Sequence, residues 1–315
     1  YFVEKFHGVK FAYLTLIIII FNPETLISSR VIEPHIFVLP FFLAAVYFAV
    51  KLIEFPKNNY LLIFYGLFSG LSIGTQSTSF YIIFPFFLIQ YVYFNKVYEF
   101  KKICKNFIIF FGYLSLTFFL LNPYSIINFN AFISDIFVGI SNVSSLKDNN
   151  VKFYETFYAP YQISLFYVVL FIVSIFYNIF YIKNDKNKIY LSLVLPSIFI
   201  YFLLSGIMQY IYSSLAIFAL LSSLMIFDIL KKLTKYQKII FSSLLILFFI
   251  SSTFTRSLYY LINFKNDNRL VAARWINENI KKNSTIGLNF PPTNWNIVPF
   301  QFYNYKLIDD NTDLK

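Results

Sequence analysis

Charged residues are scarce in this chain. Asp, Glu, Lys and Arg together make up 13% of its 315 residues, whereas roughly 25% is usual for soluble globular domains. So few charges cannot cover the water-facing surface of a soluble protein of this size. Because 58% of the residues are hydrophobic, the chain also lacks the polarity that keeps disordered proteins unfolded. The composition therefore predicts an integral membrane protein.

Cysteine and the common catalytic signatures are missing as well. Cys104 is the only cysteine, which excludes a disulfide scaffold. The sequence contains no Walker loop, dinucleotide fingerprint, zinc-ligand spacing or nucleophile elbow. No metal site is therefore predicted, and function has to be inferred from topology and from small polar clusters.

Long apolar runs are what the sequence has in abundance. A bilayer core about 30 Å thick needs roughly 20 helical residues. The runs are continuous rather than alternating, which favours helices over barrel strands. We therefore expect an all-α integral membrane protein, a multi-span helical bundle of about nine spans. The candidate spans are 9–22, 34–50, 60–75, 77–94, 106–122, 160–182, 189–205, 208–228 and 239–262.

The basic residues predict how these spans are oriented. The formal net charge is +11, and Lys and Arg collect in the cytoplasmic loops of membrane proteins. Assigning alternate loops to the cytoplasm gives that side 15 of the 26 basic residues, whereas the outer loop 123–159 holds only Lys147 and Lys152. The basic excess thus reports topology, and no nucleic-acid partner is expected. The fifteen are Lys5, Lys10, Lys51, Lys57, Lys96, Lys101, Lys102, Lys105, Lys183, Lys186, Lys188, Lys231, Lys232, Lys235 and Lys238.

Residues 60–94 form an apolar stretch that is too long for one span. Lysines flank it on both sides, so the chain is expected to cross twice. The small and polar residues from Gly74 to Ser77 suit the turn between the two crossings.

The C-terminal region changes to a polar composition. Residues 1–262 are predicted to be the membrane domain and residues 263–315 the start of a small extracytoplasmic α/β domain, with a helix followed by a strand. The buried face of that helix is expected to contain Ala272, Ala273, Trp275 and Ile276. Because the chain begins at Tyr1 rather than Met, and ends with little room for a complete domain, we expect a fragment that is truncated at both ends.

The first polar cluster on the predicted outer side opens the second span. It contains Arg30, Glu33 and His35, and polar groups near lipid are costly unless they are used. These three residue types together can bind an anionic headgroup or a metal. Alternatively, Pro34 begins the helix and Glu33 is simply a favourable acid at its N-terminus.

Two further clusters lie at the outer ends of later spans. One is Asn122-Pro123-Tyr124, for which a proline-terminated helix and surface loop is the plain alternative. The other includes Gln209 and Tyr210, for which an interfacial tyrosine belt is the alternative.

The order of four segments along the chain resembles the polytopic GT-C glycosyltransferases that use polyprenyl-phosphate sugars, a group containing aminoarabinose transferases and protein O-mannosyltransferases. The resembling features are a Ser-Arg pair with a nearby acid, paired short glycine-rich helices, a span ending in Pro-Tyr, and the opening of an outer domain. They stand in SSRVIEPHIFVLPFFLAAVYFAVKL, YGLFSGLSIGTQSTSFYIIFPF, FFLLNPYSIINFNAFISDI and NRLVAARWINENIKKNSTI.

The resemblance implies transfer of a sugar from a polyprenyl-phosphate donor to a lipid, glycan or protein acceptor. The reaction would take place at the extracytoplasmic face of a plasma or inner membrane. A divalent cation is left open as a cofactor. In the family the catalytic acid lies in the first outer loop, which is expected upstream of Tyr1. Positions implied to contact the donor are Arg30, Glu33, His35, Gln76, Tyr124, Gln209 and Tyr210.

Two of these positions depart from the family pattern, and two other classes of protein stay open. Family members often carry lysine where Gln76 stands and arginine where Gln209 stands, and both positions are neutral here. A transporter or flippase for lipid-linked sugars would show inverted repeats and ionisable residues at mid-bilayer. An oligosaccharide polymerase or ligase would place basic residues in one large outer loop.

Overall fold

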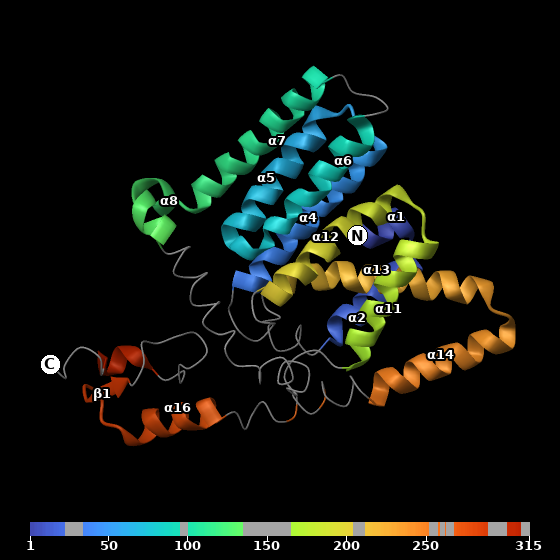
Figure 1. Cartoon of the computed structure of the whole chain (residues 1–315). Coiled ribbons are helices and arrows are strands. Elements are labelled where there is room, and N and C mark those ends of the chain that lie inside the picture. Colours follow the sequence, from blue (N-terminus) through green and yellow to red (C-terminus); the bar gives the residue numbers. More distant parts are fainter. Residues whose placement is uncertain are drawn as a thin grey trace. The chain divides into compact units, whose positions relative to one another are not determined.

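The computed structural model describes residues 1–22, 34–94, 100–134, 165–203, 212–251, 258, 262, 268–288 and 301–309. The chain divides into two units, Tyr1–Phe254 and Thr255–Lys315. The first unit is helical, and the second contains a helix and a two-stranded sheet (Figure 1).

Helices make up the described part of the first unit, as the composition predicts. Those of its N-terminal half are α1 (Phe2–His7), α2 (Val9–Ile20), α4 (Pro34–Glu54), α5 (Asn59–Thr75), the 3₁₀ helix η1 (Ser77–Ile83), α6 (Phe84–Phe94), α7 (Phe100–Leu121) and α8 (Tyr124–Ile127). Those of its C-terminal half are α11 (Leu165–Tyr181), α12 (Asp185–Leu203), α13 (Tyr212–Lys232) and α14 (Lys235–Phe249).

Three described helices are long and apolar enough to cross a membrane, namely Phe37–Glu54, Phe100–Leu121 and Ser213–Lys232. Shorter apolar helices occupy Val9–Ile20, Ser77–Val92 and Phe166–Tyr181. These findings support a helical membrane protein, whereas the count of nine spans stays a prediction.

The break inside residues 60–94 falls where the sequence indicates. Helix α5 ends at Thr75, Gln76 is extended (φ −146°, ψ 108°), and η1 begins at Ser77. A 3₁₀ helix rises ~2.0 Å per residue and an α-helix ~1.5 Å. The seven residues of η1 and the eleven of α6 therefore reach about 30 Å, the thickness of a bilayer core. The 3₁₀ geometry thus lets a short segment extend as far as a full span.

Helices α5 and α7 pack closely and run parallel, because α6 returns the chain between them (Figure 1). Three glycines spaced four residues apart form the α5 side of this contact. An ideal Cβ at Gly66 would lie 2.7 Å from the carbonyl oxygen of Phe110, and one at Gly70 would lie 2.3 Å from that of Leu114. Small residues at this spacing are what close helix packing in membranes requires.

Buried hydroxyl groups connect α2 to the rest of the bundle. The Tyr167 hydroxyl on α11 donates to the carbonyl oxygen of Ile18 at 2.7 Å, and Thr15 Oγ1 donates to Ser223 Oγ on α13 at 2.9 Å. Burying such groups without partners would be costly. These bonds therefore favour one register of α2 against α11 and α13.

The second unit contains α16 (Asn268–Asn279), β1 (Thr285–Leu288), the 3₁₀ helix η6 (Phe302–Asn304) and β2 (Lys306–Asp309). The two strands are parallel, with Thr285 opposite Lys306 and Leu288 opposite Asp309. The hydroxyl of Tyr305 donates to the carbonyl oxygen of Ile276 at 3.1 Å and so ties α16 to the residue preceding β2. A helix followed by a strand is what the sequence predicts here.

One prediction about α16 is wrong. Ala273 is buried (4% exposed), but Trp275, which was expected on the same buried face, is 58% exposed. Residues two apart on an α-helix point about 200° away from each other. A face that buries Ala273 therefore turns Trp275 outward.

Candidate functional site

Several of the predicted cytoplasmic lysines lie together at one end of the helical bundle, within the described residues. At this lysine end, Glu54 at the end of α4 pairs with Lys51 (2.5 Å) and with Lys186 near the start of α12 (2.7 Å). Lys102 Nζ, near the start of α7, donates to Asn59 Oδ1 at the start of α5 at 3.0 Å. Loops far apart in the sequence therefore meet, as the alternating assignment of loops requires.

Helix α1 is anchored at the lysine end by rings and charges. The Nζ atoms of Lys51 and Lys186 lie 5.2 and 4.9 Å from the centre of the Phe6 ring. The Nε2 atom of His7 is 2.9 Å from the hydroxyl oxygen of Tyr190. Burial, together with the nearby charge of Lys186, lowers the pKa of His7 to about 4. His7 is therefore neutral near pH 7 and acts in packing at the lysine end.

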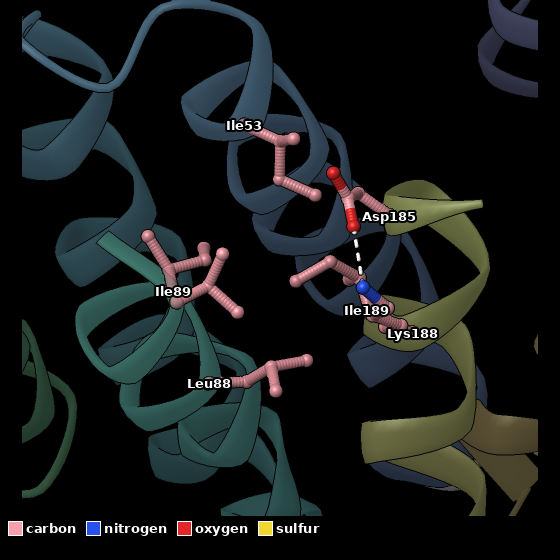
Figure 2. A pocket seen from close by; sticks show the side chains of 7 residues that line it. Ile53, Leu88, Ile89, Asp185, Lys188 and Ile189 are labelled. Atoms are coloured by element: carbon pink, nitrogen blue, oxygen red, sulfur yellow. Dashed lines mark hydrogen bonds and ion pairs between the residues drawn. The ribbon is translucent and has the colours of Figure 1, made fainter. Parts of the chain in front are cut away.

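A small, partly open hollow also lies at the lysine end. Figure 2 shows its apolar wall, which includes Ile53, Leu88 and Ile189, and the ion pair of Asp185 with Lys188 (2.6 Å). The pair satisfies both charges, and none of the residues implied to bind the donor lines this hollow. We therefore do not assign the site to it.

The opposite end of the bundle brings together two segments that the sequence singles out, and α4 starts on the same side. Asn122 Nδ2, just after α7, donates to the carbonyl oxygen of Gly74 near the end of α5 at 3.1 Å. The ring of Phe42 lies 5.4 Å from that of Tyr81 in η1. Since α4 begins at Pro34 and ends at the lysine end, its start belongs to this opposite end. We call it the hydroxyl end.

The hydroxyl end contains the described members of the predicted site. Gln76 is buried (7% exposed), and Tyr124 is 46% exposed and begins α8. The bond between Asn122 and Gly74 joins the two short segments that carry them. Arg30, Glu33, Gln209 and Tyr210 lie outside the described residues, and His35 lies in α4 with its side chain outside them.

A cluster of hydroxyl groups at this end was missed by the sequence analysis. Ser72 Oγ donates to Ser79 Oγ at 3.0 Å, and the Tyr81 hydroxyl lies 2.5 Å from Ser213 Oγ. Only the residues at the end of α5 show a pattern in the sequence that indicates this cluster, because the polar residues Ser72 and Gln76 recur on one helix face. The partners come from η1 and α13, and their proximity depends on the tertiary fold. The hydroxyl cluster consists of Ser69, Ser72, Thr78, Ser79, Tyr81 and Ser213.

Two members of the hydroxyl cluster have buried oxygens that accept or donate no hydrogen bond within the described part of the chain. They are Ser69 Oγ and Thr78 Oγ1. Such groups are uncommon in folded proteins. Hydroxyls can bond the neutral hydroxyls of a sugar or the oxygens of a phosphate, but they do not act as a general base at neutral pH.

Acidic groups are absent from the described part of the hydroxyl end. Within the described residues of the first unit, the acids are Glu4, Glu54, Asp185 and Asp228, and all lie at the lysine end. Among the residues that the structure describes, no three His, Cys, Asp or Glu side chains gather as metal ligands would. The side chains that the structure describes at the hydroxyl end thus offer neutral hydrogen-bonding groups.

Searches of protein-family models, of curated proteins and of solved structures find no match to this chain.

Proposed function

We propose that this chain is the membrane part of a glycosyltransferase that moves a sugar from a polyprenyl-phosphate donor to a lipid, glycan or protein acceptor. The observation that supports the proposal is the contact between the turn at Gln76 and the segment from Asn122 to Tyr124 at the hydroxyl end. The start of α4, the turn at Gln76 and the segment from Asn122 to Tyr124 share that end, away from the lysines.

The chemistry of such a reaction suits this arrangement. A polyprenyl chain stays in the bilayer, so its sugar can react only near a membrane surface. The departing phosphate gains negative charge and needs a cation or hydrogen-bond donors. Arg30 stands four residues before the start of α4, and we assign it to the phosphate. The hydroxyl cluster and Gln76 are assigned to polar groups of the donor.

The proposal also assigns an orientation. The lysine end faces the cytoplasm of a plasma or inner membrane, because basic loops stay inside. The hydroxyl end and the polar second unit then face outward, and about nine helices cross the bilayer. The acceptor hydroxyl needs a general base, and the proposal assigns it to no described residue.

The test is sugar transfer by the full-length protein in nanodiscs. The donors would be polyprenyl-phosphate mannose, glucose and 4-amino-arabinose, each radiolabelled, with a membrane extract as acceptor. Arg30→Ala should lower turnover about 100-fold or more, the usual effect of removing a group that stabilises developing charge. Arg30→Lys should keep part of the activity, because it keeps the charge.

Lys57→Ala is the matched control, since it removes an exposed cation at the lysine end. It should leave turnover unchanged. Absence of transfer from every donor by the unsubstituted protein would count against the proposal, and equal turnover of the Arg30→Ala and Lys57→Ala variants would remove Arg30 from the site.

A further inference from the structure

Helix α16 carries an exposed apolar pair on its outer face. Val271 and Trp275 lie one turn apart, and they are 52% and 58% exposed. The other face of α16 is the one that buries Ala273 and whose Ile276 carbonyl accepts the Tyr305 hydroxyl. Exposing a tryptophan is costly in water, because its ring has one of the largest apolar surfaces of any side chain.

The segment around this pair is basic on balance, although its single acid, Glu278, lies one turn from Trp275 on the same helix face. Residues 268–284 contain four basic side chains, Arg269, Arg274, Lys281 and Lys282, against the single acid Glu278. The segment therefore has three more positive than negative charges. Arg274 is exposed beside Trp275, and Lys281 and Lys282 are exposed just after the helix. Positive charge around an exposed aromatic ring complements an anionic lipid surface.

A second protein is a poorer fit to this face. A tryptophan and a valine can bury roughly 250–350 Å² at most, whereas a stable interface needs about 800 Å² per partner. The first unit contains helices apolar enough to cross a membrane. Only 16 residues separate Ser251, in that unit, from Asn268, so the length of the chain keeps the start of α16 within about 60 Å of Ser251.

We propose that α16 docks on the bilayer surface, with Trp275 and Val271 inserted among the lipid headgroups and with Lys281 and Lys282 bound to anionic lipid. This is the position that tryptophan prefers in membrane proteins, because its ring is apolar and its N–H can bond to water or headgroups. The inference depends on the membrane character of the first unit and not on the sugar-transfer proposal.

The test uses Trp275 fluorescence in the full chain. Trp275 and Trp295 are the only tryptophans, so Trp295→Phe leaves Trp275 as the single emitter. The protein would be placed in nanodiscs of phosphatidylcholine and phosphatidylglycerol brominated near the headgroups. We expect the brominated lipid to quench Trp275, and acrylamide in the water to quench it weakly. Should Trp295→Phe fail to fold, the difference between the original chain and Trp275→Phe gives the same signal.

Three variants sharpen the result. Replacing Lys281 and Lys282 with alanine should lower the ratio of docked to undocked α16 about fivefold per residue in anionic nanodiscs, and much less in purely phosphatidylcholine ones. Val271→Glu should abolish quenching by brominated lipid. Thr285→Glu adds the same charge at an exposed position on β1 and should leave the quenching unchanged.

Two outcomes would overturn the inference. Strong quenching by acrylamide with none by brominated lipid would mean that Trp275 stays in water. Protection from both quenchers would mean that a protein surface, such as a second copy of this chain, covers Trp275 instead.

Discussion

At the scale of single residues, the helical unit depends on side chains that are small or that carry one hydroxyl. Gly66, Gly70 and Gly74 let α5 and α7 approach, and Thr117 Oγ1 donates across that contact to the carbonyl oxygen of Leu67 at 3.1 Å. Lipid gives helices no hydrophobic reason to associate, so close packing and such bonds have to hold them. Individual glycines should therefore matter more here than large apolar residues on the lipid side.

Gly70→Ala tests that expectation. Its Cβ would lie 2.0 Å from Thr117 Oγ1 and 2.3 Å from a backbone oxygen, so one of the helices has to move. We expect a loss of about 1–3 kcal/mol in the free energy of unfolding, as for other overpacked sites. Reversible unfolding in mixed detergent micelles measures it.

Gly112→Ala is the control, because a Cβ there meets nothing within 4 Å. Alanine should stabilise helix α7 by up to about 1 kcal/mol through its higher helix propensity. Equal stability of the two variants would mean that α5 and α7 are not packed through Gly70.

At the scale of helices and strands, much of the fold follows from apolar runs and flanking lysines. The break at Gln76 is predictable because small and polar residues interrupt a run that is too long for one span. The buried face of α16 is not predictable in this way, since Ala273 and Trp275 are both acceptable residues on a buried face. The hydrogen bond from Tyr305 to the Ile276 carbonyl lies on the side that buries Ala273.

The site was harder to predict than the helices. The hydrogen bond between Asn122 and Gly74 requires α5 and α7 to run parallel. The turn at Gln76 implies this only if η1 and α6 return the chain across the whole bilayer. The bond between Tyr81 and Ser213 joins residues 132 positions apart. No local pattern indicates such a pair, because serine is common throughout this sequence.

The parallel arrangement of α5 and α7 can be tested by a disulfide. An ideal Cβ at Gly74 would lie 3.2 Å from Leu121 Cβ, close to the separation of about 3.8 Å in disulfides. In a Cys104→Ser background, the Gly74→Cys/Leu121→Cys pair should cross-link under mild oxidation. Loss of labelling by a maleimide polymer on a gel would report it.

Gly74→Cys/Phe100→Cys is the matched pair, since Phe100 begins α7, about 30 Å from Leu121 along the helix. It should stay reduced. Cross-linking of this pair in place of the first would mean that the two helices are antiparallel.

At the scale of the whole helical unit, the two ends differ in chemistry. The lysine end holds the described acids and their cationic partners, which neutralise one another in pairs such as Lys186 with Glu54. The described part of the hydroxyl end holds uncharged groups, which we propose bind polar parts of a lipid-linked donor. The central claim is that these ends face opposite sides of a membrane.

The most direct test of that claim labels two thiols, one near the start of α7 and one just after its end. Cys104 is exposed at the lysine end, and Tyr124→Cys, in a Cys104→Ser background, would place a thiol at the hydroxyl end. In intact cells, a membrane-impermeant maleimide should label Tyr124→Cys and should reach Cys104 only after the membrane is permeabilised. Labelling of both positions from outside, or of Cys104 alone, would contradict the account.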